Sequence, residues 1–403
     1  MKQRSRQFYP PKLNPGLVRV LQKIAPGLAH VIYRLDLMIS VEPSVQLDAL
    51  QENPCLLLCN HPSFDDRVVM FLLSAYLEQP FYYMTAYEQF QGWKGAFYQQ
   101  IGAYSIQRGL ADRDSIAQTL TLLSQPDCKL VIFPEGGCSF QNDTVMPFRT
   151  GAVQLGLQAL ARQVKQGQPL SDLHVIPVSL KYRYIGKMTP VIEKTLRGLE
   201  QALKISASGD YYQRLRTIAA QVLQGYEQEY GISLPEAVTW NQRIVALKTE
   251  VLQQCEHRLG LTSAPGASNR ERIYRIRHIL EKRQDTLLAD GTDAWEVMSK
   301  AMSRALNFDA IYDGYVAEKP TPERFLDTLI RLEREVFGID EPSPKAHRQA
   351  FLRIGKPVNL KDCFEGYTND RAGTVTFLVE QLQRSIQRNL DVLSEATVRG
   401  ISW

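Results

Sequence analysis

The sequence predicts an α/β fold in which a mainly parallel central sheet is flanked by helices and interrupted by a large all-helical insertion. Two observations support this prediction. Between residues 55 and 185, short apolar runs alternate with helix-length segments, which is typical of buried parallel strands joined by crossover helices. From residue 186 to 348, apolar residues recur at helical spacing with few strand signals, before strand character returns.

Length and composition are those of an ordinary globular protein. The chain has 403 residues, of which 44% are hydrophobic and 22% charged, so extensive disorder and collagen-like repeats are excluded. The longest apolar run, Val68 to Leu77, is too short to span a bilayer. Six cysteines lack paired spacing, which indicates reduced thiols, and no set of residues at metal-ligand spacing is apparent. We therefore expect no metal site.

The first 36 residues are basic and amphipathic. They hold seven basic side chains and one acidic side chain, a net charge of +6, whereas the whole chain has a net charge of +4. From Pro15 to Tyr33 apolar residues recur every three or four positions around Pro26-Gly27, which predicts a short pair of helices. This segment either packs on the domain or rests on anionic lipid, and its composition alone leaves both interpretations open.

The first part of the α/β domain contains four expected strands. Each is a short apolar run, at residues 55–59, 81–84, 130–133 and 175–180. A helix is expected from Asp65 to Tyr76, directly after the first strand. Open α/β folds place their active sites where parallel strands end, so the turns after these strands are the first candidates for a site.

The later part of the chain is predicted to be helical until a closing strand. A helix is expected to begin at Thr189-Pro190, and further helical stretches cover 208–260, 270–285, 293–308 and 322–337. Strand character returns at 351–354, and an amphipathic helix over about 371–392 follows. The predicted parts are a basic N-terminal segment at 1–36, the first part of the α/β domain at 37–185, a helical insertion at 186–348, and the closing strand and helix at 349–403.

A polar motif follows the first strand directly, with the sequence N-H-P-S-F-D-D at residues 60–66. His61 and Asp66 can pair only if His61 lies in the turn and Asp66 in the first helical turn, as a capping box with Ser63 as N-cap would arrange. A carboxylate bound to one imidazole nitrogen leaves the other nitrogen to take a proton from a hydroxyl group. Alternatively, Asp66 only caps the helix and His61 is a polar turn residue.

Two further motifs end strand-like segments. In F-P-E-G-G-C-S, at residues 133–139, Glu135 stands beside glycines that let a backbone approach a ligand closely, although a tight turn with a solvated Glu135 is the simpler interpretation. In G-A-Y-S-I-Q-R-G, at residues 102–109, Arg108 either binds a phosphate or is a surface charge.

Taken together, these motifs resemble a known family. In order and spacing, the three motifs and a fourth, V-I-P-V-S-L at residues 175–180, resemble the four motif blocks of the glycerolipid acyltransferases, which include 1-acylglycerol-3-phosphate acyltransferase. The resemblance covers residues from about 50 to 185, and the later I-G-K-P-V-N-L is similar to the family's closing strand. One departure is Gly137-Cys138, where the family usually has Thr-Arg, so this chain lacks one cation of the expected phosphate site.

The resemblance implies a role for each matching residue. His61 is the expected general base and Asp66 its charge-relay partner. Arg108 matches the residue implicated in holding the acceptor's phosphate, and Ile176-Pro177 match the apolar block near the acyl chain. Arg149 matches a basic position downstream of the third block. The complete set of expected substrate-binding residues is Asn60, Arg108, Glu135, Gly136, Gly137, Ser139, Arg149, Ile176 and Pro177.

The function implied by the resemblance is transfer of a fatty acyl group from acyl-CoA or acyl carrier protein to a glycerolipid hydroxyl in phospholipid biosynthesis. The leading acceptor is 1-acylglycerol-3-phosphate. Beyond the thioester co-substrate we expect no cofactor, and no nucleic-acid partner. Lipid substrates favour a cytoplasmic protein with peripheral contact between residues 1–36 and an anionic membrane. The alternatives are a membrane-associated lipid-binding or scaffold protein with a degenerate acyltransferase domain, and a hydrolase that uses water as acceptor.

Overall fold

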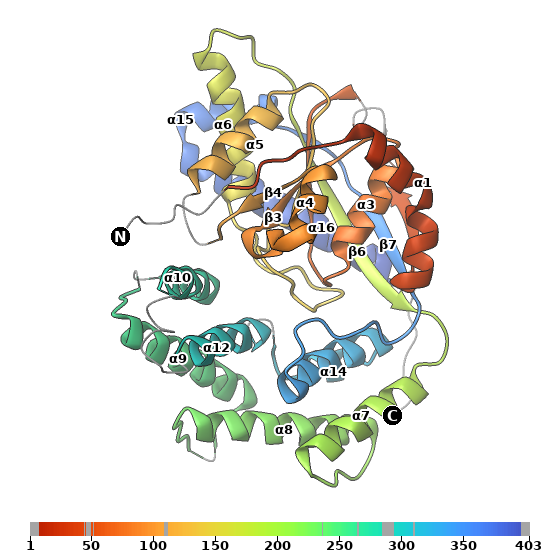
Figure 1. Ribbon diagram of the computed structural model, residues 1–403, viewed down its shortest axis with the longest axis vertical. Coiled ribbons are helices and arrows are strands. Elements are labelled where there is room, and N and C mark those ends of the chain that lie inside the picture. The colour runs from red at the N-terminus through yellow and green to blue at the C-terminus, as the bar shows by residue number, and fades with distance from the viewer. Residues whose placement is uncertain are drawn as a thin grey trace. The chain divides into compact units, whose positions relative to one another are not determined.

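The computed structural model describes residues 8–43, 45, 50, 52–108, 112–235, 237–263, 266–283, 294–308 and 311–395. The described residues fall into two compact units (Figure 1). The first unit contains the described residues of three segments: those up to Gln107, those from 112 to Ile185, and those from His347 to 395. The second unit consists of Gly186–Ala346 together with Arg108. Gly186–Ala346 falls within the predicted helical insertion.

A mainly parallel sheet forms the centre of the first unit, as the sequence predicted. In the described part of the chain its order is β1-β7-β6-β2-β5-β3-β4, with β8 pairing alongside β6. Neighbouring strands are parallel, except that β6 runs antiparallel to β7 and β8. The strands are β1 (Leu35–Val41), β2 (Cys55–Cys59), β3 (Tyr82–Ala86), β4 (Ala103–Ile106), β5 (Lys129–Ile132), β6 (His174–Tyr184), β7 (Arg348–Ile354) and β8 (Val358–Asn359).

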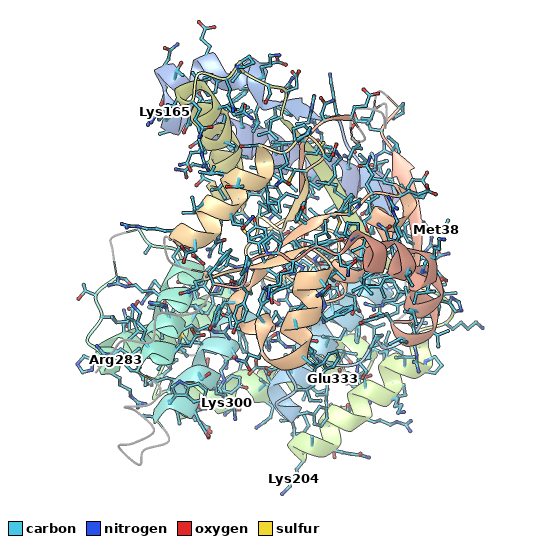
Figure 2. All side chains as sticks on the ribbon, turned by 45° about the horizontal axis from the view of Figure 1, so that its top comes forward. Met38, Lys165, Lys204, Arg283, Lys300 and Glu333 are labelled. Carbon is cyan, nitrogen blue, oxygen red and sulfur yellow. The ribbon has the colours of Figure 1, made fainter. Side chains whose placement is uncertain are left out.

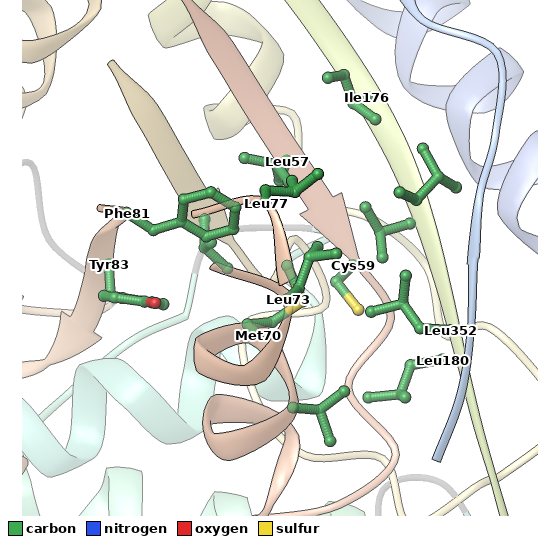
Figure 3. Close-up of a cluster of buried hydrophobic side chains, with 14 of the residues drawn as sticks. Leu57, Cys59, Met70, Leu73, Leu77, Phe81, Tyr83, Ile176, Leu180 and Leu352 are labelled. Atoms are coloured by element: carbon green, nitrogen blue, oxygen red, sulfur yellow. The ribbon is translucent and has the colours of Figure 1, made fainter. Parts of the chain in front are cut away.

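Helices pack on both faces of this sheet. They are α1 (Pro15–Ile32), α3 (Asp66–Tyr76), α4 (Gly92–Gln100), α5 (Arg113–Leu123), α6 (Gly151–Lys165), α15 (Phe364–Asn369) and α16 (Arg371–Glu395), with short 3₁₀ turns η1 (Tyr87–Phe90) and η2 (Leu360–Cys363). Leu57 of β2 packs with Leu73 of α3 in one core (Figure 3), whereas the adjacent Leu56 packs with Leu157 of α6 in the other. Since successive strand residues point to opposite faces, a strand covered on both sides is apolar throughout.

The topology brings two polar loops to one edge of the sheet. β2 and β5 are parallel neighbours, with Leu58 opposite Ile132 at their carboxyl ends. The loop of residues 60–66 leaves β2 at this edge, and the loop of residues 133–139 leaves β5 beside it. The motifs at 60–66 and 133–139 therefore start next to each other.

The N-terminal helix differs from the prediction. A helix pair broken at Pro26-Gly27 was expected, but α1 is one helix that continues through both residues. Pro26 lies on the exposed side of α1, where its missing N–H costs the helix one backbone hydrogen bond, the one to the Gln22 carbonyl. The opposite side of α1 is held on the unit, where Ala29 packs against Leu72 of α3.

The edge strand β1 was not predicted. It pairs in parallel with β7, Leu35 opposite Arg348, and its other edge has no strand partner among the described residues. Only Leu35 of this strand is buried, so its sequence lacks the continuous apolar run that identified β2.

The described part of the second unit is helical. Its helices are α7 (Thr189–Leu203), α8 (Tyr211–Glu229), α9 (Trp240–Leu259), α10 (Asn269–Lys282), α12 (Ala294–Phe308), α13 (Tyr315–Glu318) and α14 (Pro322–Phe337). The single stretch predicted at 208–260 is two helices, because Thr239 forms a capping box that begins α9. Lys204, labelled in Figure 2, ends α7 in the left-handed conformation.

Candidate active site

His61 and Asp66 form a hydrogen-bonded pair at the edge where β2 ends. His61 Nδ1 lies 2.6 Å from Asp66 Oδ2. The Asp66 side chain is fully buried, whereas the His61 side chain is 20% exposed. The imidazole is thus accessible from outside, while the carboxylate that orients it is shielded from water.

The turn between these residues departs from the predicted capping box. Asp65, rather than Ser63, is the residue that precedes α3, and it makes no side-chain capping bond. Asp66 Oδ2 still accepts the Ser63 backbone N–H at 3.0 Å, which is one half of the reciprocal capping pattern. The same oxygen therefore binds the turn and the imidazole, which fixes the position of Asp66 relative to His61.

Tyr182 of β6 binds the second oxygen of Asp66. Its hydroxyl donates to Oδ1 at 2.6 Å. Burial, followed by the nearby charge of Asp66, raises the pKa of Tyr182 well above its usual value, so this group stays a hydrogen-bond donor. Burial also raises the pKa of Asp66, although the hydrogen bonds from His61, Tyr182 and Ser63 oppose that effect. Asp66 is thus a buried acceptor that three groups hold in place.

Tyr182 was not predicted as a site residue, because the apolar run of its strand ends at Leu180. β6 continues to Tyr184, and the half-buried Lys181 and Arg183 alternate with the buried Tyr182 and Tyr184. This alternation of aromatic and charged residues is a period-two strand signal that extends the prediction far enough to reach Tyr182.

Arg348 is a second residue that the sequence did not reveal. It lies at the start of β7 and forms an ion pair with Asp65, the neighbour of Asp66. Its guanidinium carbon is 5.0 Å from the centroid of the Tyr182 ring. Since 283 positions separate Arg348 from Asp65, only the fold brings it here.

The loop of residues 133–139 binds both backbone polar groups of His61. Glu135 Oε1 accepts the His61 N–H at 3.1 Å, and the His61 carbonyl accepts the Ser139 N–H at 2.7 Å. The Phe133 ring stacks on the imidazole, with centroids 4.3 Å apart. Glu135 is 1% exposed, so the prediction of a solvated turn residue is wrong. The structure shows that Glu135 and Ser139 position His61.

Gly136 and Arg149 lie against each other beside this loop. Gly136 has φ +74°, a conformation that favours glycine, and a Cβ placed there would lie 2.7 Å from Arg149 Nε. The Arg149 N–H also donates to the Pro134 carbonyl at 2.9 Å. The glycine is therefore what allows the guanidinium group to approach the 133–139 loop, where the half-buried Gly137 also lies.

Like Glu135 and Ser139, three more of the expected substrate-binding residues lie in the interior. Asn60 is fully buried, and its side-chain amide exchanges two hydrogen bonds, of 2.9 and 2.8 Å, with the backbone of Leu180. This contact ties the end of β2 to β6, so Asn60 positions the loop and does not face a substrate. Ile176 and Pro177 are buried in β6, and Ile176 belongs to the core shared with α3. Their role near an acyl chain stays a prediction.

Arg108 belongs to the second unit, although it follows strand β4 of the first unit in the sequence. Its Nη1 donates to the Tyr274 hydroxyl at 3.2 Å, and its guanidinium carbon lies 4.6 Å from the centroid of the Tyr274 ring. Its expected role in holding a phosphate stays a prediction.

Comparison with known proteins bears on this arrangement. Residues 42–181 match the family model described as Acyltransferase, a range that contains His61, Asp66, Glu135 and Arg149 and ends one residue before Tyr182. No curated protein was found to match the sequence. The geometry of the pair and the family match agree, and residues 42–181 form an acyltransferase domain of the glycerolipid acyltransferase family.

Proposed function

We propose that this acyltransferase moves a fatty acyl group from acyl-CoA or acyl carrier protein to a glycerolipid hydroxyl, with 1-acylglycerol-3-phosphate as the first candidate acceptor. This activity belongs to phospholipid biosynthesis. The observation that carries the proposal is the 2.6 Å contact between His61 Nδ1 and the buried Asp66, because it directs the other ring nitrogen toward a substrate.

The chemistry follows from this pair. His61 Nε2 takes the proton of the acceptor hydroxyl as its oxygen attacks the thioester carbonyl carbon. The tetrahedral intermediate then collapses, the carbon–sulfur bond breaks, and the leaving thiolate takes the proton back from the imidazolium. Asp66 stabilises the transient positive charge of His61, and Tyr182 holds the second carboxylate oxygen. No acyl-enzyme intermediate is needed, so Cys138 has no role as a nucleophile.

Arg149 is our candidate for the group that binds the acceptor's phosphate. The family's usual Thr-Arg is replaced here by Gly137-Cys138, and Arg149 supplies a guanidinium group against the neighbouring Gly136. A guanidinium group suits a phosphate because its parallel N–H donors match two phosphate oxygens. A free phosphate monoester, as in 1-acylglycerol-3-phosphate, fits this chemistry better than a neutral acceptor.

We further propose that α1 contacts an anionic membrane surface. No helix in the described part of the chain is long and apolar enough to cross a bilayer. The outer side of α1 nevertheless exposes a row of large apolar side chains, and Arg19 and Lys23 beside them are exposed cations. The row consists of Val20, Ile24, Leu28, Val31 and Ile32. An apolar row flanked by basic residues supports an interfacial helix that lies on the bilayer.

Labelled acyl-CoA and acyl carrier protein thioesters, offered with a panel of lysolipids, test the enzymatic proposal. The expected product is labelled diacyl lipid, formed fastest with the phosphorylated acceptor. Labelled free fatty acid alone would indicate a hydrolase, and no turnover with any acceptor would favour the scaffold alternative. Either of those two results would reject the proposed function.

A further inference from the structure

Two histidines and an aspartate from distant parts of the chain meet at one place in the first unit. Asp36 Oδ1 lies 2.8 Å from His30 Nδ1, and Asp36 Oδ2 lies 2.7 Å from His347 Nε2. One ligand atom from each residue lies within 4.8 Å of the others, and the two imidazole centroids are 4.5 Å apart. Since 311 positions separate His347 from Asp36, no local spacing in the sequence reveals this cluster.

We propose that His30, Asp36 and His347 bind a divalent first-row transition metal ion, with Zn²⁺ as the first candidate. Two imidazoles and one carboxylate form a ligand set that zinc takes in proteins, and imidazole disfavours Mg²⁺ and Ca²⁺, which prefer oxygen ligands. The proposal departs from the expectation that the chain has no metal site. It does not depend on the proposed acyl transfer, since the hydrogen bonds that form this cluster involve neither His61 nor Asp66.

Binding of an ion requires the three ligand side chains to rearrange locally. At 2.7 and 2.8 Å the two contacts are hydrogen bonds, each with a ring proton between nitrogen and oxygen. Tetrahedral zinc, at about 2.0–2.1 Å from each ligand, separates neighbouring ligand atoms by about 3.3 Å. The two contacts go to different oxygens of Asp36, so an ion bound through one of them needs that oxygen and its imidazole nitrogen to part by roughly 0.5 Å. The three ligand atoms, which lie within 4.8 Å of one another, then close to about 3.3 Å. Each imidazole then carries its proton on its other ring nitrogen.

The backbone holds two of the ligands and leaves the third able to adjust. Asp36 lies in β1 and His347 directly precedes β7, its parallel neighbour, where Arg348 N–H donates to the Arg34 carbonyl at 2.8 Å. His30 comes from the last turn of α1, and its side chain is 60% exposed. The strand that carries Asp36 can be found in Figure 2 by its labelled residue Met38.

Because the three ligands come from separate elements, the bound ion would fasten α1 to the sheet. The side chains of Asp36 and His347 are 39% and 27% exposed, so water has access to complete the coordination sphere. An ion that binds only the folded chain raises its stability by RT ln(1 + c/Kd), where c is the free ion concentration. Zinc is therefore expected to shift thermal unfolding as well as to bind.

Calorimetric titration of the untagged full chain with zinc chloride tests the site. We expect one zinc ion per chain at this cluster, an affinity at least tenfold weaker in His30→Gln, and loss of this binding in His30→Gln/His347→Gln. His257→Gln is the matched control, because His257 is an exposed histidine of α9 in the second unit, and it should bind zinc as the native chain does.

Thermal unfolding of the same proteins, with and without zinc, gives the second measurement. Zinc should raise the Tm of the native chain and of His257→Gln but not that of the double variant. His30→Gln changes an exposed side chain, so its fold is expected to remain intact, which the Tm without zinc verifies. A native chain that binds no zinc, or a folded double variant that binds it with native affinity, would overturn the proposal.

Discussion

The Tyr182 hydroxyl forms a hydrogen bond of 2.6 Å with Oδ1 of Asp66, and His61 Nδ1 forms one of the same length with Oδ2 of that carboxylate. The carboxylate is therefore held from both sides, and its orientation toward the imidazole depends on a strand residue that lies 116 positions away. Tyr182 is in this sense a positioning residue for His61, acting through Asp66.

Removal of this hydroxyl tests that role. We expect Tyr182→Phe to lower kcat about tenfold, which corresponds to ~1.4 kcal/mol, because Asp66 loses one of the donors that fix it. Leaving a buried acceptor without its partner should also lower the free energy of unfolding by about 1–3 kcal/mol. Steady-state kinetics and urea unfolding measure the two effects. Tyr104→Phe removes a buried hydroxyl of β4 that bonds Thr119 rather than Asp66, and it should keep native kcat.

The general-base role of His61 predicts a larger effect. Proton transfer by a positioned side chain typically contributes a factor of about 10²–10⁴, so His61→Ala should lower kcat by at least that range. The fold should tolerate the change, since the His61 side chain is partly exposed. His257→Ala, at an exposed position of α9, is the control. Native turnover of acyl thioester by a folded His61→Ala protein would contradict the mechanism.

The contact between Gly136 and Arg149 predicts a specific binding defect. In Gly136→Ala, the new methyl group would meet Arg149 Nε at 2.7 Å on a backbone with φ +74°, so the guanidinium group must move. We expect the KM for a phosphorylated acceptor to rise about tenfold, which corresponds to ~1.4 kcal/mol of lost binding, while the KM for the thioester stays unchanged.

Two further variants separate charge from backbone effects. Arg149→Gln should show the same split between acceptor and thioester, since it removes the charge directly. Gly151→Ala adds a methyl group that meets no atom within 4 Å, so its kinetics should be native. If Gly136→Ala and Arg149→Gln raised the two KM values equally, Arg149 would not be the phosphate ligand.

The sequence predicted the parts of this site that local order determines. A buried strand, a polar turn and a helix bring His61 and Asp66 together within seven residues, and parallel neighbours bring the 133–139 loop to the same edge. The mainly parallel sheet followed from strands that are apolar on both faces, such as Cys55–Cys59.

The remaining parts depend on contacts that no local pattern encodes. Tyr182 lies beyond the continuous apolar run of its strand, and Arg348 reaches Asp65 only after the chain returns from the second unit. The capping-box pattern also predicted the wrong N-cap, Ser63, because the helix begins at Asp66. The Asp66 carboxylate binds His61 and Tyr182 in addition to the turn. Tertiary contacts decided these positions.

The pKa of Asp66 predicts how stability responds to pH. Burial raises this pKa above the ordinary value of 3.8, so between the two values the folded protein holds a proton that the unfolded chain has released. The free energy of unfolding contributed by this group therefore falls as pH rises through that window. Relative to Asp66→Asn, which does not titrate, the native chain should lose stability from pH 4 upward and then level off.

Urea unfolding of both proteins at a series of pH values from 4 to 8 measures this difference. Asp114→Asn, which changes an exposed carboxylate of α5, is the control for the loss of one carboxylate and is measured over the same series. A native chain that gains stability over Asp66→Asn as pH rises would show that the hydrogen bonds from His61, Tyr182 and Ser63 outweigh burial.

The exposed row of α1 predicts how the chain binds membranes. Ile24 and Val31 are 48% and 75% exposed, and burying such side chains in a lipid interface contributes about 1.5–3 kcal/mol each at full burial. Ile24→Asp/Val31→Asp should therefore weaken binding to anionic liposomes at least tenfold in a sedimentation assay. Val245→Asp places one such charge at a 57% exposed position of α9 and should bind natively. Because Arg19 and Lys23 flank the row, binding should also weaken as salt rises. Equal liposome binding by the native chain and the double variant would assign the membrane contact to another surface.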